Sequence, residues 1–279
     1  MIAAGAALER LWTGGTWCEG PLWIPAEGCV RWSDIPGDRI LRWDAATGDA
    51  TEHRTGVEFT NGRALDRDGS VVQCSHGRRR LERERADGTV SALADGYDGV
   101  RLNSPNDVAI AADGAYWFTD PDYGITQPLE GHPGEREYGA CWVFRLDPDG
   151  TLAPVVRDLD RPNGIAFSPD GAILYVTDTG AAPAIHAYDV EGVAVGNGRR
   201  FAAPAVGHSD GIAIDVDGRV WSSAGDGVHV YEPDGRESAF IPVPEVVSNV
   251  CFGGADGDEL FITATTSLYR IRTATSGSA

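Results

Sequence analysis

The chain has 279 residues, of which 42 are acidic and 23 are basic, giving a formal net charge of −19 at pH 7. This excess of negative charge disfavours nucleic acids and anionic membrane surfaces as partners and favours a soluble protein. No stretch approaches the roughly 20 apolar residues of a membrane span, and the N-terminal segment lacks the basic and apolar parts of a signal peptide.

A repeated unit runs through the chain. Each unit opens on an oxygen-bearing side chain and reaches a turn glycine at a nearly constant spacing, after which an apolar strand is expected. The opening side chains are Glu19, Asn61, Asn106, Asn163, Asp210 and Asn249, and the turn glycines are Gly28, Gly69, Gly114, Gly171, Gly218 and Gly257. Strands are predicted after the turns at 30–32, 71–74, 116–118, 174–176, 220–221 and 260–262. Third strands are predicted at 40–43, 143–146, 229–231 and 268–271, and no long segment has helical periodicity.

Repeats of about 40–50 residues that contain several short strands are typical of a β-propeller. We therefore predict an all-β fold, a six-bladed β-propeller with four-stranded blades, in which residues 1–279 form a single domain. The segment 7–12 precedes the first unit, and we expect it to complete the last blade and pair its open edge. A β-sandwich or two separate β-domains is the alternative, but the even spacing and the lack of a Pro/Gly/Ser-rich linker argue against it. An insertion at 123–138 is long enough to cover a site.

The opening side chains are predicted to form a ring, because the innermost strand of each propeller blade lines the central channel. Two carboxylates and four amides held close together are costly without a cation. The chain contains no lysine that could neutralise them. Oxygen donors with two negative charges suit Ca²⁺ first and then Mg²⁺ or Mn²⁺, and the lack of a ring histidine makes Zn²⁺ less favoured. Taken singly, Asn61, Asn163 and Asn249 are also compatible with simple turn chemistry.

The five cysteines are scattered and odd in number, and none forms a Cys-x-x-Cys pair. Buried free thiols in a reducing, cytoplasmic setting are therefore expected. Phosphate-binding and dinucleotide-binding glycine motifs are absent from the sequence, which disfavours a nucleotide cofactor.

At residues 18–23, 102–108, 117–124, 161–170 and 209–215 the chain resembles the senescence-marker/gluconolactonase family, which includes regucalcin, and in particular its bacterial gluconolactonase branch. The resemblance covers nearly the whole length. It implies a six-bladed propeller and a divalent metal, commonly calcium, bound by Glu19, Asn163 and Asp210. Asn106 matches a family position that binds metal or substrate. The run Cys-Ser-His-Gly at 74–77 departs from the Cys-Glu-His-Gly of the bacterial branch, near a substrate contact.

These features predict a metal-dependent hydrolase that opens a sugar lactone with metal-activated water. Asp210 is the candidate catalytic base as well as a metal ligand. The predicted substrate-binding residues are Asn106, Asp107, Asn61, His76 and Asn249, with His76 behind the site. Asp120 and Asp178 are expected to cap turns, and Glu135, Glu137 and Tyr138 to form a lid.

Other activities remain open at this point. The resemblance extends to diisopropylfluorophosphatase and, more distantly, to paraoxonases, so a phosphotriesterase or another esterase is an alternative. A repurposed biosynthetic enzyme and a non-catalytic calcium-binding propeller are further alternatives, because fold alone does not decide function. The sugar lactone comes first because a metal with orienting amides suits a neutral, polyhydroxylated substrate. The expected protein is a monomer or small homo-oligomer with no nucleic-acid or membrane partner.

Overall fold

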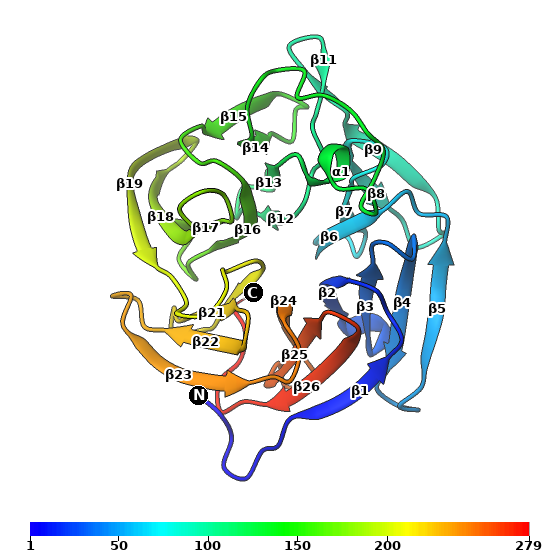
Figure 1. Ribbon diagram of the computed structural model, residues 1–279, viewed down its shortest axis with the longest axis vertical. Coiled ribbons are helices and arrows are strands. Elements are labelled where there is room, and N and C mark those ends of the chain that lie inside the picture. The colour runs from blue at the N-terminus through cyan, green and yellow to red at the C-terminus, as the bar shows by residue number, and fades with distance from the viewer. Residues whose placement is uncertain (279) are drawn as a thin grey trace.

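The structure is a computed structural model that describes residues 1–278. Six antiparallel four-stranded sheets surround a central axis (Figure 1), so the predicted six-bladed propeller is confirmed. The first three blades contain β2 (Cys18–Ile24), β3 (Cys29–Asp34), β4 (Arg39–Asp44) and β5 (Ala50–Thr55); β6 (Thr60–Leu65), β7 (Val71–Ser75), β8 (Arg80–Glu84) and β9 (Val90–Ala94); and β12 (Val108–Ile110), β13 (Tyr116–Asp120), β14 (Trp142–Leu146) and β15 (Leu152–Val156).

The remaining blades have the same order of strands. They contain β16 (Pro162–Phe167), β17 (Ile173–Asp178), β18 (Ala184–Glu191) and β19 (Ala194–Ala202); β20 (Ile212–Ile214), β21 (Val220–Ser223), β22 (Gly227–Tyr231) and β23 (Glu237–Pro242); and β24 (Val247–Gly253), β25 (Glu259–Ala264) and β26 (Ser267–Arg272) with β1 (Glu9–Thr13). A small ribbon of β10 (Gly96–Tyr97) and β11 (Val100–Arg101) was not predicted from the sequence.

The N-terminal strand closes the ring, as the sequence predicted. Strand β1 pairs antiparallel with β26, with Thr13 opposite Ser267 and Glu9 opposite Arg270. The last blade is therefore built from both ends of the chain. This pairing covers the backbone groups of the outer edge of β26, which would otherwise be free to bind another strand.

Large apolar side chains fill the space between neighbouring blades. Trp117 and Trp221 are fully buried at equivalent places in the second strands of their blades. Trp32 is also fully buried, one residue further along its strand, where it packs with Phe261 and Leu268 of the last blade. Trp221, for example, belongs to a core cluster with Leu260 and Ile262 of the next blade. Replacing one such tryptophan by alanine would cost about 3–5 kcal/mol, so these positions hold the blades at a fixed mutual distance.

The inner strands approach one another closely where glycine follows a ring residue. A Cβ at Gly62 would lie 2.6 Å from the carbonyl oxygen of Asn106 in the next blade, and a Cβ at Gly164 would lie 2.4 Å from that of Asp210. Only glycine fits at such distances. The Gly62 amide instead donates a hydrogen bond of 2.8 Å to the Asn106 carbonyl. These glycines therefore bring the ring residues of successive blades together.

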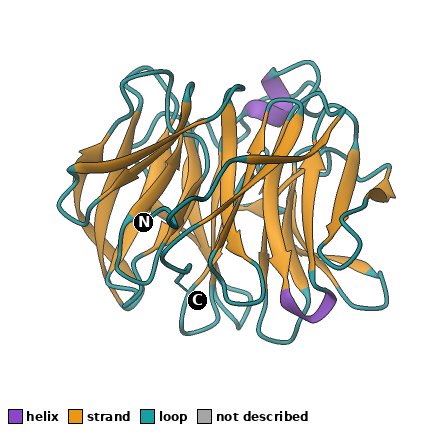
Figure 2. Cartoon of the chain, turned by 90° about the horizontal axis from the view of Figure 1, so that it is seen from below, coloured by secondary structure: helices purple, strands orange, loops and turns teal. Residues whose placement is uncertain are grey.

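The two faces of the propeller differ. Figure 2 shows the helix α1 (Tyr123–Thr126) at one face, and the C-terminal end of the chain and the 3₁₀ helix η1 (Pro25–Glu27) at the opposite face. At that opposite face Gly277 forms a β-bridge with Asp215, and the Ser278 amide donates to the Ile214 carbonyl. Within residues 1–278, every helix is too short or too polar to serve as a membrane span.

Candidate active site

A cavity of about 160 Å³ opens at the face that carries α1. Five of the six predicted ring residues line it, each from the start of an inner strand or the loop just before one. The lining residues are Glu19, Asn61, Asn106, Asn163, Asp210, Trp17, Ile35, Tyr123, Gln127, Glu130 and His208. Segments that are far apart in the sequence thus place their oxygen atoms in one small space, as the repeat predicted.

Glu19 and Asp210 are the acidic members of the ring. Glu19 is 3% exposed, and its Oε2 accepts hydrogen bonds from the Gly20 amide at 2.7 Å and from Asn249 Nδ2 at 3.0 Å. Burial raises the pKa of Glu19 to about 8, although these two hydrogen bonds oppose the shift. Burial, and then the charge of Glu19, raise the pKa of Asp210 well above its ordinary value. Two carboxyl groups therefore share a cavity in which their negative charges are poorly compensated.

No arginine forms an ion pair with either carboxylate among residues 1–278. A divalent cation would supply the missing positive charge, and oxygen-only donors suit Ca²⁺ or Mg²⁺. No group of three or more His, Cys, Asp and Glu side chains arranged to hold a metal is found in the described part of the chain. The oxygen atoms available here come from two carboxylates and from asparagine side chains, and a cation that prefers oxygen ligands can bind such a mixture.

The side-chain oxygen of Asn61 is free to bind a ligand in this cavity. Its Oδ1 is buried and has no hydrogen-bond partner within the described residues. The cause lies behind it, where Asn61 Nδ2 and His76 Nε2 are 3.2 Å apart and His76 Nδ1 is 3.0 Å from the Glu130 carbonyl oxygen. A carbonyl oxygen only accepts, so Nδ1 donates, Nε2 of the neutral ring accepts, and Asn61 Nδ2 is the donor. The Asn61 oxygen is then left without a partner, as expected for a group that binds a ligand.

His76 itself lies behind the cavity rather than in its lining. The side chain is fully buried, and burial lowers the pKa of His76 to about 4, so the ring is neutral near pH 7. The structure thus places His76 behind Asn61, which it orients, and not in the cavity lining, where the prediction of substrate binding had put it.

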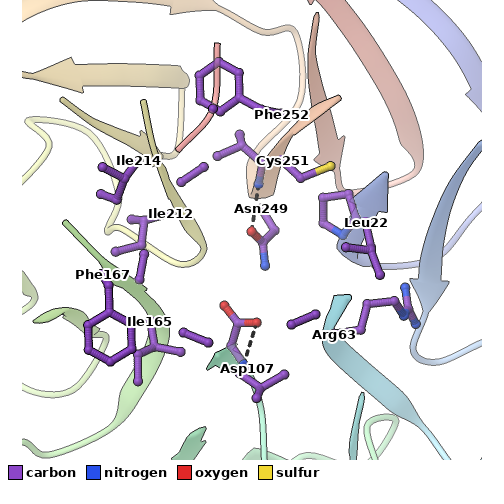
Figure 3. A pocket seen from close by; sticks show the side chains of 18 of the residues that line it. Leu22, Arg63, Asp107, Ile165, Phe167, Ile212, Ile214, Asn249, Cys251 and Phe252 are labelled. Atoms are coloured by element: carbon purple, nitrogen blue, oxygen red, sulfur yellow. Dashed lines mark hydrogen bonds between the residues drawn. The ribbon is translucent and has the colours of Figure 1, made fainter. Parts of the chain in front are cut away.

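Asp107 and Asn249 lie deeper than the other predicted residues. Both line a second cavity of about 340 Å³ in the central channel, and Figure 3 shows their side chains pointing toward one another across it. Each accepts a hydrogen bond from the amide of the following residue, Val108 at 2.9 Å and Val250 at 2.8 Å. Burial raises the pKa of Asp107 to about 7. Neither side chain lines the mouth cavity, although Asn249 reaches Glu19 from below.

The long insertion covers the mouth through residues other than those expected. Tyr123, Gln127 and Glu130 line the cavity. Glu137 instead pairs with Arg79 at 3.1 Å, and the Tyr138 hydroxyl donates to Asp120 Oδ2 at 2.7 Å. The sequence indicated a covering loop by its length, but which side chains point inward depends on how the loop folds, and the repeat carries no such information.

Asp120 and Asp178 cap loops, as the sequence predicted. The Asp120 carboxylate accepts hydrogen bonds from the amides of Asn103 and Ser104, both at 2.7 Å. The Asp178 carboxylate accepts from the amides of Asp160 and Arg161 at 2.9 and 2.8 Å. These aspartates fix the loops that lead into the ring positions Asn106 and Asn163.

Comparison with known proteins decides the family. The sequence profile of the SMP-30/gluconolactonase/LRE-like region matches residues 17–266. The chain belongs to this family. A gluconolactonase of Zymomonas mobilis is 33% identical to the chain. The alignment covers 99% of the chain and 84% of the gluconolactonase. The pentonolactonase XacC of Haloferax volcanii is 34% identical over 88% of the chain and 80% of its length.

Solved structures give the same result. A gluconolactonase from Xanthomonas campestris superposes with a TM-score of 0.93 at 41% identity, over 97% of this family member and 91% of that chain. A calcium-binding protein, the regucalcin of Agrobacterium tumefaciens, superposes with a TM-score of 0.80 over 98% of the chain and 95% of its own, at 22% identity. That second similarity concerns the fold alone.

Proposed function

We propose that this member of the family is a lactonase that opens a sugar lactone by hydrolysis and depends on one divalent cation at the mouth of the channel. The observation that carries the proposal is the pair of carboxyl groups of Glu19, which is buried, and Asp210, which is partly buried; they share a cavity with amide oxygens, and neither forms an ion pair among residues 1–278. The named gluconolactonase and pentonolactonase relatives support sugar lactones as the substrate class.

Glu19, Asn163 and Asp210 would hold the cation, with Asn106 beside them, and Ca²⁺ is the first candidate. The unpartnered Oδ1 of Asn61 supports a ligand at this place. When bound, such a cation supplies positive charge that stabilises the oxyanion of the lactone carbonyl and lowers the pKa of water.

Asp210 acts as the base in this proposal. One of its carboxylate oxygens accepts a proton from the attacking water, whose oxygen joins the carbonyl carbon of the lactone. The bond from that carbon to the ring oxygen then breaks, and the ring oxygen takes the proton from Asp210 and leaves as a hydroxyl group, which returns Asp210 to its ionised form. Asp210 must be ionised to accept this proton, and the positive charge of a neighbouring cation favours its ionised form. Asn61 and Asn106 orient the substrate from the cavity wall.

Asp107 and Asn249 do not line the proposed substrate cavity, because they face the channel cavity. Asn249 holds Glu19 through the hydrogen bond of 3.0 Å to its Oε2. Asp107 occupies the position at which four of the other ring residues are followed by glycine, and its carboxylate lies against Gly62. We infer that both residues support the ring from below.

The state of the cysteines indicates the kind of cellular compartment in which the protein works. All five are free, and Cys18, Cys29, Cys74 and Cys141 are buried. Burial raises the pKa of Cys141 to about 12, so its thiol is unreactive. Free, unreactive thiols fit a reducing compartment, which supports the cytoplasm as the proposed location.

The test is a pH-drop assay over a panel of aldonolactones. The protein is used as purified, after exhaustive chelation, and after each of Ca²⁺, Mg²⁺, Mn²⁺ and Zn²⁺ is added back. We expect turnover that chelation removes and that a divalent cation restores. We also expect Asp210→Asn to lower kcat by at least about a hundredfold while the fold is retained. Hydrolysis of organophosphates with no turnover of any aldonolactone would contradict the proposal.

A further inference from the structure

We propose that Glu130, on the loop between α1 (Tyr123–Thr126) and β14 (Trp142–Leu146), binds hydroxyl groups of the sugar lactone and makes the enzyme selective for hydroxylated lactones. This inference rests on the proposed function and adds the residue that recognises the substrate away from the reacting carbonyl. The first observation is position, because Glu130 lines the mouth cavity together with Glu19 and Asp210.

The carboxylate of Glu130 lacks a protein partner. Within residues 1–278 it accepts no hydrogen bond and forms no ion pair, and burial is the one cause that raises its pKa. The charge of Glu130 in turn raises the pKa of both Glu19 and Asp210, so the three acids lie within electrostatic reach of one another. A half-buried carboxylate with no donor is costly, and the hydroxyl groups of a sugar would supply the missing hydrogen bonds.

The backbone around Glu130 is held firmly, so the side chain is presented from a fixed support. His76 Nδ1 donates to the Glu130 carbonyl at 3.0 Å, and the Glu130 amide donates to the Gln127 carbonyl at 3.3 Å. The Gly134 amide donates to the Ile125 carbonyl at 3.1 Å, which closes the loop on itself. A binding group that is already ordered loses less conformational entropy when the ligand arrives.

The position of Glu130 favours hydroxyl binding over cation binding as the role of its carboxylate. The ring already provides two acids for a cation, Glu19 in β2 and Asp210 just before β20, whereas Glu130 comes from the covering loop. A carboxylate accepts hydrogen bonds from two neighbouring hydroxyl groups, and such charge-assisted bonds are stronger than neutral ones. Gln127 adds an amide that both donates and accepts in the same cavity. Together they match a neutral polyol.

The experiment compares Glu130→Gln with Glu135→Gln, a matched change on an exposed residue of the same loop that does not line the cavity. Each variant is assayed with glucono-1,5-lactone and with δ-valerolactone, the six-membered lactone that lacks hydroxyl groups. The second compound is measured as a substrate or, if it turns over slowly, by its inhibition constant. Ca²⁺ affinity is measured by calorimetry for every protein.

Glu130→Gln should lower kcat/KM for gluconolactone about tenfold to a hundredfold, mainly through KM, because a bond to a charged acceptor is weakened. The value for δ-valerolactone and all values for Glu135→Gln should stay within about twofold of wild type, and the loss of one neighbouring negative charge should weaken Ca²⁺ binding by less than about tenfold. An equal loss on both lactones, or a loss of Ca²⁺ affinity of about a hundredfold or more, as expected for a cation ligand, would overturn the inference. Wild-type activity with no effect of Glu130→Gln would refute this inference alone, whereas a wild type that opens neither lactone would refute the proposed function as well.

Discussion

His76 Nε2 accepts a hydrogen bond from Asn61 Nδ2 at 3.2 Å, and this contact determines which atom of Asn61 faces the cavity. The other ring nitrogen of His76 donates to the carbonyl oxygen of Glu130 at 3.0 Å. A single neutral imidazole therefore connects the covering loop to the ring of oxygen donors. Because both bonds need one donating and one accepting nitrogen, the arrangement holds only while His76 is uncharged.

We expect His76→Leu to release Asn61 and to lower kcat/KM by about tenfold, since one or two hydrogen bonds near the site are lost. His76→Gln should retain most of the activity, because its amide can donate to Glu130 and accept from Asn61 as the imidazole does. Steady-state kinetics and Ca²⁺ titration of both variants check this expectation. Equal losses in the two variants would show that the volume of the imidazole, rather than its hydrogen bonding, is what matters.

Cation binding should be coupled to protonation. The pKa of Glu19 is raised to about 8 from an ordinary 4.5 when no cation is present. For a raised carboxyl pKa, the contribution to stability is full below pH 4.5 and is lost as the pH rises through about 8. The thermal midpoint of the chelated protein should therefore fall across this window.

Saturating Ca²⁺ should prevent that loss, because the cation binds the ionised form, and Ca²⁺ binding should release protons within the same window. Thermal denaturation from acidic to alkaline pH, with and without Ca²⁺, provides the measurement. Two curves that stay parallel across the whole range would contradict the coupling between Glu19 and the cation.

Glu245 should stabilise the last blade in a pH-dependent way. Partial burial opposes its ionisation, but hydrogen bonds from Ser267, Tyr269 and Thr266 outweigh this and lower the pKa of Glu245 to about 2. The Tyr269 hydroxyl donates to its Oε1 at 2.6 Å, and the Thr266 amide donates to its Oε2 at 2.8 Å. Glu245→Gln should thus reduce the free energy of unfolding by about 1 kcal/mol at pH 7.

Because this pKa is lowered, the stabilisation is present above pH 4.5 and is lost as the pH falls toward 2. Urea denaturation of wild type and Glu245→Gln at pH 7 and near the acidic limit of folding should show a gap that narrows with acidity. Glu191→Gln, on an exposed residue, serves as the control. A gap that is independent of pH would mean that the charge of Glu245 contributes nothing.

The close approach of inner strands can be tested at Gly164. A Cβ there would lie 2.4 Å from the carbonyl oxygen of Asp210, which must move to make room. Gly164→Ala should cost about 1–3 kcal/mol of stability and also weaken cation binding through Asp210. Gly196→Ala is the matched control, because no heavy atom lies within 4 Å of a Cβ at that position. Two variants of equal stability and equal Ca²⁺ affinity would rule out this role for the glycine.

Much of the fold could be predicted because each repeat contains a turn glycine followed by an apolar strand at a nearly constant spacing. The apolar strands after the turn glycines appear as β3, β7, β13, β17, β21 and β25, and the closing strand appears as β1. The outermost strands were harder to locate, since residues such as those of β5 (Ala50–Thr55) and β19 (Ala194–Ala202) are polar and largely exposed. Such strands are set by pairing with the neighbouring strand and not by an apolar pattern.

The site was predictable only at the level of the ring. The repeat placed Glu19, Asn163 and Asp210 at one mouth, and all three line the cavity there. It could not show that Asn249 faces the channel, because the repeat indicates where the backbone of a residue lies and not the direction of its side chain. Nor could it identify Glu130, whose place depends on hydrogen bonds within a loop that has no counterpart in the other repeats.

The central claim is that one divalent cation compensates the paired acids Glu19 and Asp210. Calorimetric titration of the chelated protein with Ca²⁺ tests it most directly, with wild type compared with Glu19→Gln and Asp210→Asn. The account predicts one site in wild type and affinity that is weaker by at least about a hundredfold in each variant. Undiminished Ca²⁺ binding in either variant, or full lactonase activity in wild type that binds no divalent cation, would contradict it.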